Sequence, residues 1–371
     1  MIKVAHSVFE SAGGCREDFF AATAEKSDNF AAEAAALWDA YLAALPQCSC
    51  SDDGEVLLRF HLSDVTNQLP ELERLVGHRK SLLSIVGQAP ANARIALEAW
   101  HWHGASLTRS GGGVVAGLQN YRAHWFNVPQ LPAASSYEQT AAEFEQLKKF
   151  LAASGGNVAS HTVRTWLYCR DVDNNYQGLV DARNDFFAAN GLTRDTHFIA
   201  STGIEGQMAD VHRLVKMDSL SIPELRPEQM IYLSAPEMLS PTTLYGVSFE
   251  RGTRVVYGDR SHYFISGTAS IDSAGKVVHP HDVIAQSCRM LDNVDALLKS
   301  SGSELSQIRW ATLYLRDIAD ADAVTAIVKS RIGSDLPLVT VKAPVCRPGW
   351  LVELECVAVN DRGDSAYPDF C

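Results

Sequence analysis

His262-Tyr-Phe-Ile-Ser-Gly-Thr-Ala-Ser270 is the stretch of this sequence that decides the fold. Its β-branched and aromatic residues, closed by small ones, are typical of a buried strand. The residues from His281 to Leu298 then carry apolar side chains at helical spacing, and strand and helix continue to alternate. The expected elements are a strand at 262–270, a helix at 281–298, a strand at 308–315, a helix at 319–332 and strands at 339–345 and 350–359, preceded by strands at 245–249 and 254–257.

Two weaker copies of this β-α-β-α-β-β order precede it. The middle of the chain predicts a hairpin at 114–126, helices at 137–153 and 176–189, and strands at 161–168, 197–201 and 214–217. The first hundred residues predict helices at 30–45 and 68–76 and strands at 56–62, 82–86 and 95–102. Repeated order at a fixed period indicates internal duplication, and 371 residues divided by three gives about 124 per unit. We therefore expect an α+β fold of three repeats, at residues 1–103, 104–225 and 226–371.

The composition excludes several classes of function. The formal charge is −12, from 32 basic and 44 acidic residues, so the surface is unsuited to binding a nucleic-acid backbone non-specifically. No apolar run approaches the ~18–20 residues of a membrane span. The first twenty residues lack the basic and apolar segments of a secretion signal. We expect a cytoplasmic enzyme that acts on a small molecule, with no membrane or nucleic-acid partner.

The cysteines and histidines predict neither disulfides nor a metal site. The eight cysteines are spread thinly through a chain large enough to build its own core, so they are expected to be reduced. Cys48 and Cys50 form a close pair without a second ligand pair at zinc-like spacing. His101 and His103 likewise lack a third ligand, as do the two histidines at 279 and 281. No metal or other cofactor is expected.

The third repeat carries a resemblance to a known superfamily. Residues 265–298, ISGTASIDSAGKVVHPHDVIAQSCRMLDNVDALL, and the ending LVELECVAV at 351–359 resemble a RidA (YjgF-like, endoribonuclease L-PSP) domain. Members of that superfamily are units of this size that form trimers, with a ligand cleft at each subunit interface. The resemblance implies chorismate-mutase-like repeats joined as an intrachain pseudo-trimer, a monomeric chain, and one functional cleft between the second and third repeats.

Within the superfamily, the chain is similar to the chorismatases, which cleave the enolpyruvyl group from chorismate. The ordered motifs that match are Arg164-Thr-Trp166, Ser201-Thr-Gly-Ile204, Thr242-Thr-Leu-Tyr-Gly246, Phe249-Glu-Arg251, Ser266-Gly-Thr-Ala-Ser270, Tyr314-Leu-Arg316, and Cys346 followed by Leu351-Val-Glu353. The first repeat shares little sequence with that family, and Cys169-Arg-Asp-Val-Asp-Asn-Asn175 differs from its pattern. These departures leave open a sister group with another substrate.

The resemblance assigns candidate substrate-binding residues. Chorismate carries two carboxylates, and the planar fork of an arginine binds a carboxylate through two hydrogen bonds. Arg164, Arg251 and Arg316 are the candidate cations, and we expect them to converge on one pocket with Tyr245 and Gly267.

A general acid is needed to protonate the methylene carbon of the enol ether. Glu353 and Glu355 alternate along one strand and therefore share a face, where burial would raise a carboxyl pKa toward neutrality. Glu353 matches the family's catalytic acid. The resemblance makes Cys346 a second candidate catalytic residue. It also implies that Gly267 together with Cys346 marks the type that forms 3-hydroxybenzoate, and that Ala in place of Gly267 marks the type that forms a dihydro-dihydroxybenzoate.

Two alternatives remain open. Imine and enamine deaminases of the RidA type hold the substrate carboxylate with an arginine just after a proline on the penultimate strand. The corresponding segment here, Leu336-Pro-Leu-Val-Thr-Val-Lys-Ala343, contains no arginine. A non-catalytic small-molecule-binding protein would use the same cleft without needing an acid such as Glu353.

Overall fold

The computed structural model describes residues 2–127 and 134–371. The first repeat forms a sheet in the order β1-β2-β6-β3-β4, covered by two helices. Its elements are β1 (Val4–Glu10), β2 (Arg16–Thr23), α1 (Phe30–Gln47), β3 (Glu55–Leu62), α2 (Val65–Val76), β4 (Leu82–Gly87) and β6 (Ile95–Trp102).

The second and third repeats have the same connectivity. The second consists of β8 (Gly113–Gly117), β9 (Arg122–Asn127), α3 (Ser136–Ala152), β10 (Thr162–Cys169), α5 (Val172–Ala189), β11 (Ala200–Glu205) and β12 (Val215–Ser221). The third consists of β14 (Gly252–Val256), β15 (Ser261–Ala269), α6 (Val283–Lys299), β16 (Ile308–Leu315), α7 (Ala321–Ile332), β17 (Leu338–Lys342) and β18 (Val352–Asn360). Additional short elements are β5 (Ala89–Pro90), β7 (Ser106–Ser110), α4 (Val158–His161) and β13 (Met230–Tyr232).

The three sheets share one hydrogen-bonding pattern. The sheet orders β8-β9-β12-β10-β11 and β14-β15-β18-β16-β17 match that of the first repeat strand for strand. In each repeat the last strand lies antiparallel between the second and third strands, and the third and fourth strands are parallel. The expectation of three α+β repeats in one chain is confirmed.

The predicted order within a repeat was incomplete. Each repeat begins with a two-stranded hairpin before its first helix, so the order is β-β-α-β-α-β-β. The hairpin of the first repeat, β1 and β2, was not predicted. The strand expected at 245–249 is wrong: the chain there makes a 3-10 turn at Thr242–Tyr245, which ends at Gly246 with φ 80°. Positive φ is tolerated by glycine and interrupts an extended strand.

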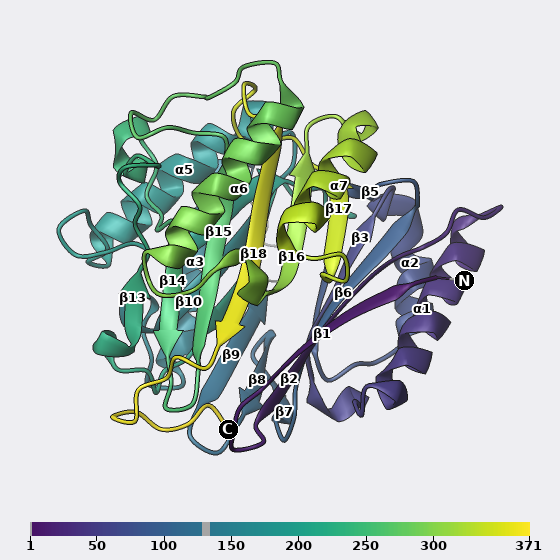
Figure 1. Cartoon of the computed structure of the whole chain (residues 1–371), viewed down its shortest axis with the longest axis horizontal. Coiled ribbons are helices and arrows are strands. Elements are labelled where there is room, and N and C mark those ends of the chain that lie inside the picture. Colours follow the sequence, from purple (N-terminus) through teal and green to yellow (C-terminus); the bar gives the residue numbers. More distant parts are fainter. Residues whose placement is uncertain (1, 128–133) are drawn as a thin grey trace.

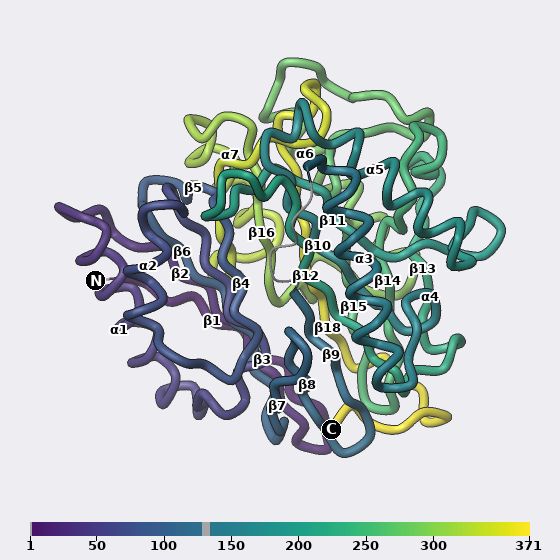
Figure 2. The backbone as a smooth tube through the Cα atoms, turned by 180° about the vertical axis from the view of Figure 1, so that it is seen from behind, coloured from purple at the N-terminus to yellow at the C-terminus, as the bar shows by residue number. Residues whose placement is uncertain are grey.

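The helices lie outside and the sheets pack toward a shared centre. In Figure 1, α6 and α7 lie in front of the third sheet and α1 lies at one side; Figure 2, seen from behind, shows α3 and α5 on the opposite face. Tryptophans from all three repeats pack together in the core, with Trp100 5.8 Å from Trp125 and 6.3 Å from Trp310 between ring centres. The helices form because their apolar residues recur on one face, as in α6, whose N-terminus is capped by Asp282.

One covalent link was not expected from the sequence. Cys15, just before β2, and Cys371 form a disulfide with a Cα–Cα distance of 5.8 Å. Figure 1 shows the end of the chain beside the β1–β2 turn. The expectation that all cysteines are reduced was therefore wrong for this pair, because the fold brings together two residues 356 positions apart. Among the described residues, no helix is both long and apolar enough to cross a membrane.

Candidate active site

A narrow cavity lies where the second repeat meets the third. β11 and α5 form one side of it, and β15, β18 and the segment before β14 form the other. Five of the predicted site residues line it, namely Tyr245, Arg251, Gly267, Cys346 and Glu353. Residues from the second repeat that line it include Tyr176, Arg183, Ser201, Thr202 and Gly203.

Glu353 and Glu355 share a face of β18 but have different surroundings. Glu355 accepts hydrogen bonds from Nη2 of Arg164 at 2.8 Å and from Nε1 of Trp166 at 2.9 Å. No described residue donates a hydrogen bond to the carboxyl of Glu353, although only 6% of this residue is exposed. Burial, reinforced by the negative charge of Glu355, raises the pKa of Glu353 to about 8. The Glu353 carboxyl is therefore protonated near neutral pH.

Gly267 makes room for the Glu353 carboxyl. A Cβ atom built at Gly267 would overlap a carboxyl oxygen of Glu353 and lie 2.7 Å from its Cδ. The backbone N–H of Gly267 donates to Oγ1 of Thr202 at 2.8 Å, which ties β15 to β11 across the repeat interface. The absence of a side chain at this position therefore allows the Glu353 carboxyl to lie against β15.

Two arginines present unpaired donors at the cavity. Arg251 donates through Nη2 to the carbonyl oxygen of Ser240 at 2.9 Å, but no described residue accepts from its buried Nε. Arg183, on α5, is 1% exposed, and its Nε and Nη2 also lack acceptors among the described residues. Buried donors without partners are costly, so this pair is suited to a ligand that brings acceptor oxygens.

Cys346 and Tyr245 also line the cavity. Burial, with the Glu353 charge nearby, raises the pKa of the Cys346 thiol to about 12, so it remains protonated at neutral pH and is a poor nucleophile. The Tyr245 ring lies under two guanidinium groups, with its centre 5.5 Å from the Arg251 carbon and 5.2 Å from that of Arg347. Tyr245 is thus held as a fixed aromatic surface.

Of the three arginines expected in one pocket, Arg251 lines the cavity, whereas Arg164 and Arg316 do not. Arg164 lies behind it, where Nη2 donates to Glu355 and to Thr202 and Nη1 donates to Ser266 at 3.3 Å. Arg316 follows β16 and bonds to the Asp173 carboxylate at 3.0 and 3.2 Å. Both guanidinium groups are held by nearby acceptors.

Arg183 was missed by the sequence analysis. It lies seven residues after Tyr176 on α5, two helical turns along the same face, and both side chains reach the cavity. An arginine on the apolar face of an amphipathic helix was the available signal. The sequence alone did not show that this face borders another repeat.

Comparisons with known proteins agree with this architecture. The endoribonuclease L-PSP family model matches residues 253–360. A 2-iminobutanoate/2-iminopropanoate deaminase of Capra hircus is 32% identical over 109 residues, which cover 29% of this chain and 79% of that protein. The 3-hydroxybenzoate synthase of Streptomyces hygroscopicus is 25% identical over 260 residues, 64% of this chain and 74% of that protein. A solved chorismatase structure matches with a TM-score of 0.67 and 19% identity, covering 96% of this chain and all of that one.

The chain belongs to the RidA (endoribonuclease L-PSP) superfamily. The deaminase match covers less than a third of the chain, whereas the chorismatase fold extends over nearly all of it. Within the superfamily, the protein is a chorismatase-like member.

Proposed function

We propose that the protein removes the enolpyruvyl group of chorismate as pyruvate and leaves 3-hydroxybenzoate, with Glu353 as the general acid. The observation that carries this proposal is the state of Glu353: a cavity carboxyl with no hydrogen-bond donor among the described residues and a pKa raised to about 8. Such a group is protonated at neutral pH and is free to give its proton to a substrate.

The reaction begins with proton transfer from Glu353 to the methylene carbon of the enol ether. The carbon–carbon π electrons form the new C–H bond, and the ether oxygen becomes part of an oxocarbenium ion. The bond between that oxygen and the ring then breaks, and its electron pair stays with the oxygen, which leaves in pyruvate. The oxygen of the hydroxyl on the neighbouring ring carbon bonds to the carbon that loses the ether and gives its proton to the Glu353 carboxylate, which makes an epoxide. The epoxide bond to the original hydroxyl carbon then breaks, with its electron pair taken by the oxygen and a proton returned to that oxygen by Glu353. Loss of the hydrogen on the carbon that now bears the hydroxyl, to the Glu353 carboxylate, makes the ring aromatic. The two products together contain the atoms of chorismate, so no net water is consumed.

Charge complementarity supports an anionic substrate. Arg183 and Arg251 bring unpaired N–H donors to the cavity of a chain whose net charge is −12. Two carboxylates on one substrate would supply the acceptors that these groups lack. Cys346 and Gly267 are assigned to positioning of the ring, since the thiol is protonated and Gly267 leaves space beside the acid.

Incubation with chorismate tests the proposal. Coupled detection with lactate dehydrogenase should show pyruvate, and chromatography should show an equal amount of 3-hydroxybenzoate. A parallel reaction with 2-iminobutyrate tests the deaminase alternative, which the absence of arginine from β17 disfavours. Turnover of the imine without release of pyruvate from chorismate would overturn the proposal.

A further inference from the structure

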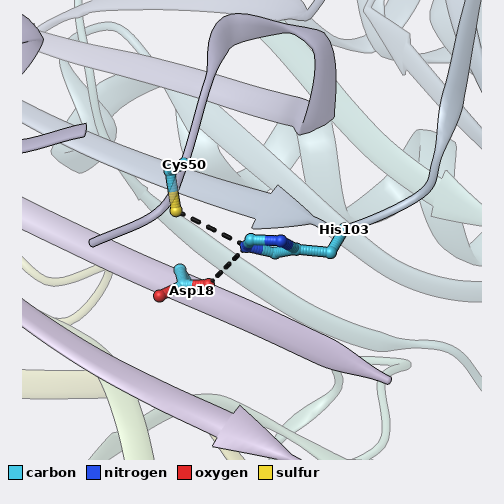
Figure 3. Close-up of side chains that lie close together, drawn as sticks. All are labelled: Asp18, Cys50 and His103. Atoms are coloured by element: carbon cyan, nitrogen blue, oxygen red, sulfur yellow. Dashed lines mark hydrogen bonds and ion pairs between the residues drawn. The ribbon is translucent and has the colours of Figure 1, made fainter. Parts of the chain in front are cut away.

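A second cluster of reactive side chains lies in the first repeat, and it shares no residue with the cavity around Glu353. Asp18 is on β2, Cys50 is in the loop after α1, and His103 directly follows β6. Figure 3 shows the three side chains pointing toward one another. Nε2 of His103 is 2.8 Å from Oδ2 of Asp18 and 3.5 Å from Sγ of Cys50.

The geometry differs from that of a catalytic triad. In a triad, the carboxylate and the nucleophile contact different nitrogens of the imidazole ring, so that a proton can pass between them. Here Asp18 and Cys50 both approach the same nitrogen, Nε2. That nitrogen carries at most one proton, so it cannot link the two groups in series. Three potential ligand atoms that lie within 4.8 Å of one another are instead arranged around a common point.

Neighbouring side chains orient the carboxylate of Asp18. His6 contacts Oδ1 through Nε2 at 2.6 Å, and Arg16 donates to Oδ1 through Nη2 at 2.7 Å. Arg16 also donates to the carbonyl oxygen of Cys48 at 2.8 Å, which fixes the loop that carries Cys50. Partners of this kind commonly hold the ligands of metal sites in place.

The cluster is accessible to solvent at His103. The Asp18 side chain is fully buried, whereas that of His103 is 31% exposed. An ion could therefore enter from the His103 side and keep one coordination position in contact with solvent.

We propose that Asp18, Cys50 and His103 bind one zinc ion, with a water molecule as the fourth ligand. A mixed set of sulfur, nitrogen and carboxylate oxygen suits this borderline-soft cation, and three protein ligands with one open position is a common tetrahedral arrangement. The pairs Cys48/Cys50 and His101/His103 each lack further ligands in the sequence. In the folded chain, Cys50 and His103, one residue from each pair, lie together with Asp18. His101 instead bonds to the hydroxyl of Tyr41 at 2.7 Å.

Metal binding to the full-length protein tests the proposal. After treatment with a chelator and dialysis, the protein should bind one equivalent of Zn²⁺ in calorimetry. Co²⁺ should produce the visible bands of a tetrahedral site and a thiolate-to-cobalt charge-transfer band, and Zn²⁺ should abolish them by displacement.

Variants identify the ligands. C50S should remove the charge-transfer band, and both C50S and H103Q should weaken Zn²⁺ binding by at least about tenfold. The matched control is C288S, which changes an exposed cysteine on α6 and should leave binding unchanged. Circular dichroism checks that each variant folds. If a variant does not fold, the titration of the wild type still tests whether the protein binds zinc. The proposal is overturned if the wild type binds no stoichiometric zinc, or if its cobalt spectrum lacks the thiolate band.

Discussion

Two interfaces between repeats carry a basic and an acidic residue at the same backbone position. The last strand of each repeat lies opposite the third in matching register, which pairs Ala96 with His61, Lys216 with Tyr168, and Glu353 with Tyr314. Lys216, between the first and second repeats, is therefore the counterpart of Glu353, between the second and third. The difference between these two residues separates an ionisable group that has hydrogen-bond partners in both repeats from one that has none among the described residues.

Lys216 has hydrogen-bond partners, whereas Glu353 has none among the described residues. Its Nζ donates to Oγ of Ser84 at 2.7 Å and to the carbonyl oxygen of Ile85 at 3.3 Å, and lies 3.3 Å from Oδ1 of Asp218. Burial lowers the pKa of Lys216 to about 8. The acceptors come from both repeats, so the ammonium group joins them much as a ligand would. Both groups line a pocket between repeats, but Lys216 is held by acceptors from both repeats, whereas Glu353 has no hydrogen-bond donor among the described residues.

A neighbouring position on the closing strands, that of Glu355, has cationic partners that Glu353 lacks. Glu98, Asp218 and Glu355 occupy equivalent places on the three closing strands. The guanidinium group of Arg59 lies among them, with N–O distances of 3.4, 3.9 and 3.7 Å respectively. Arg164 adds a second cation beside Glu355. The positive charge is concentrated on this ring of carboxylates, and Glu353 lies outside it.

The largest effect should come from E353Q. Removal of a general acid should lower the rate of pyruvate release by ~10²–10⁴-fold. The amide is nearly isosteric and removes a group whose ionised form is disfavoured, so the variant should stay folded. K216M, at the equivalent position of the other interface, is the matched control and should keep the wild-type rate. Equal turnover by E353Q and the wild type would show that Glu353 is not the general acid.

Replacing one cavity arginine should have the next largest effect. R183Q removes a charged contact to a substrate carboxylate, which is worth ~1.5–3 kcal/mol in a desolvated site, or about ten- to a hundredfold in KM. R316Q should change KM little, because Arg316 is bonded to Asp173 outside the cavity. Steady-state kinetics of both variants would measure the contrast. A larger rise in KM for R316Q than for R183Q would indicate that the substrate binds near the end of β16 instead.

The pH dependence should be smaller but characteristic. If Glu353 must be protonated, kcat should be constant below pH 8 and fall about tenfold per unit above it, since its pKa is raised to about 8. The sign is that of an acid, because the active form is lost as pH rises. Rates measured from pH 6 to 10 would show this. K216M should have the same profile, and a shift in that variant would show that the two interfaces are electrostatically coupled.

G267A should give the most limited change. The added methyl group must displace the Glu353 carboxyl, and such overpacking costs ~1–3 kcal/mol of stability. Activity should fall less than in E353Q because the acid is still present, and product should shift toward a dihydro-dihydroxybenzoate. Denaturant titration and product chromatography would detect these changes. G13A, in the β1–β2 turn, has space for the methyl group and should match the wild type.

The sequence predicted those parts of the molecule that depend on local pattern. Alternation along β18 placed Glu353 and Glu355 on one face, and helical spacing located α6 and α7 within a few residues. The strand β2 was missed because its buried residues include Glu17, a charged residue whose partners are Arg260 and His262 in the third repeat. A pattern of apolar residues does not reveal a buried charge whose neutralising group is distant in the sequence.

The candidate site was predictable only within one repeat. Residues on β15 and β18 were identified from their motifs, whereas the roles of the arginines depend on contacts between repeats. Arg164 and Arg183 both belong to the second repeat, yet only Arg183 reaches the cavity, because Glu355 holds Arg164 behind the sheet. The disulfide between Cys15 and Cys371 was beyond prediction for the same reason.

Joining three repeats in one chain changes what mutation can do to them. In a symmetric trimer of identical subunits, each substitution occurs at all three interfaces at once. A lysine at the position of Glu353 would then remove every acid together. Here each copy can vary alone, so Ala96, Lys216 and Glu353 coexist at equivalent places. The covalent connection also holds each repeat at a high effective concentration near its neighbours, so assembly does not depend on protein concentration.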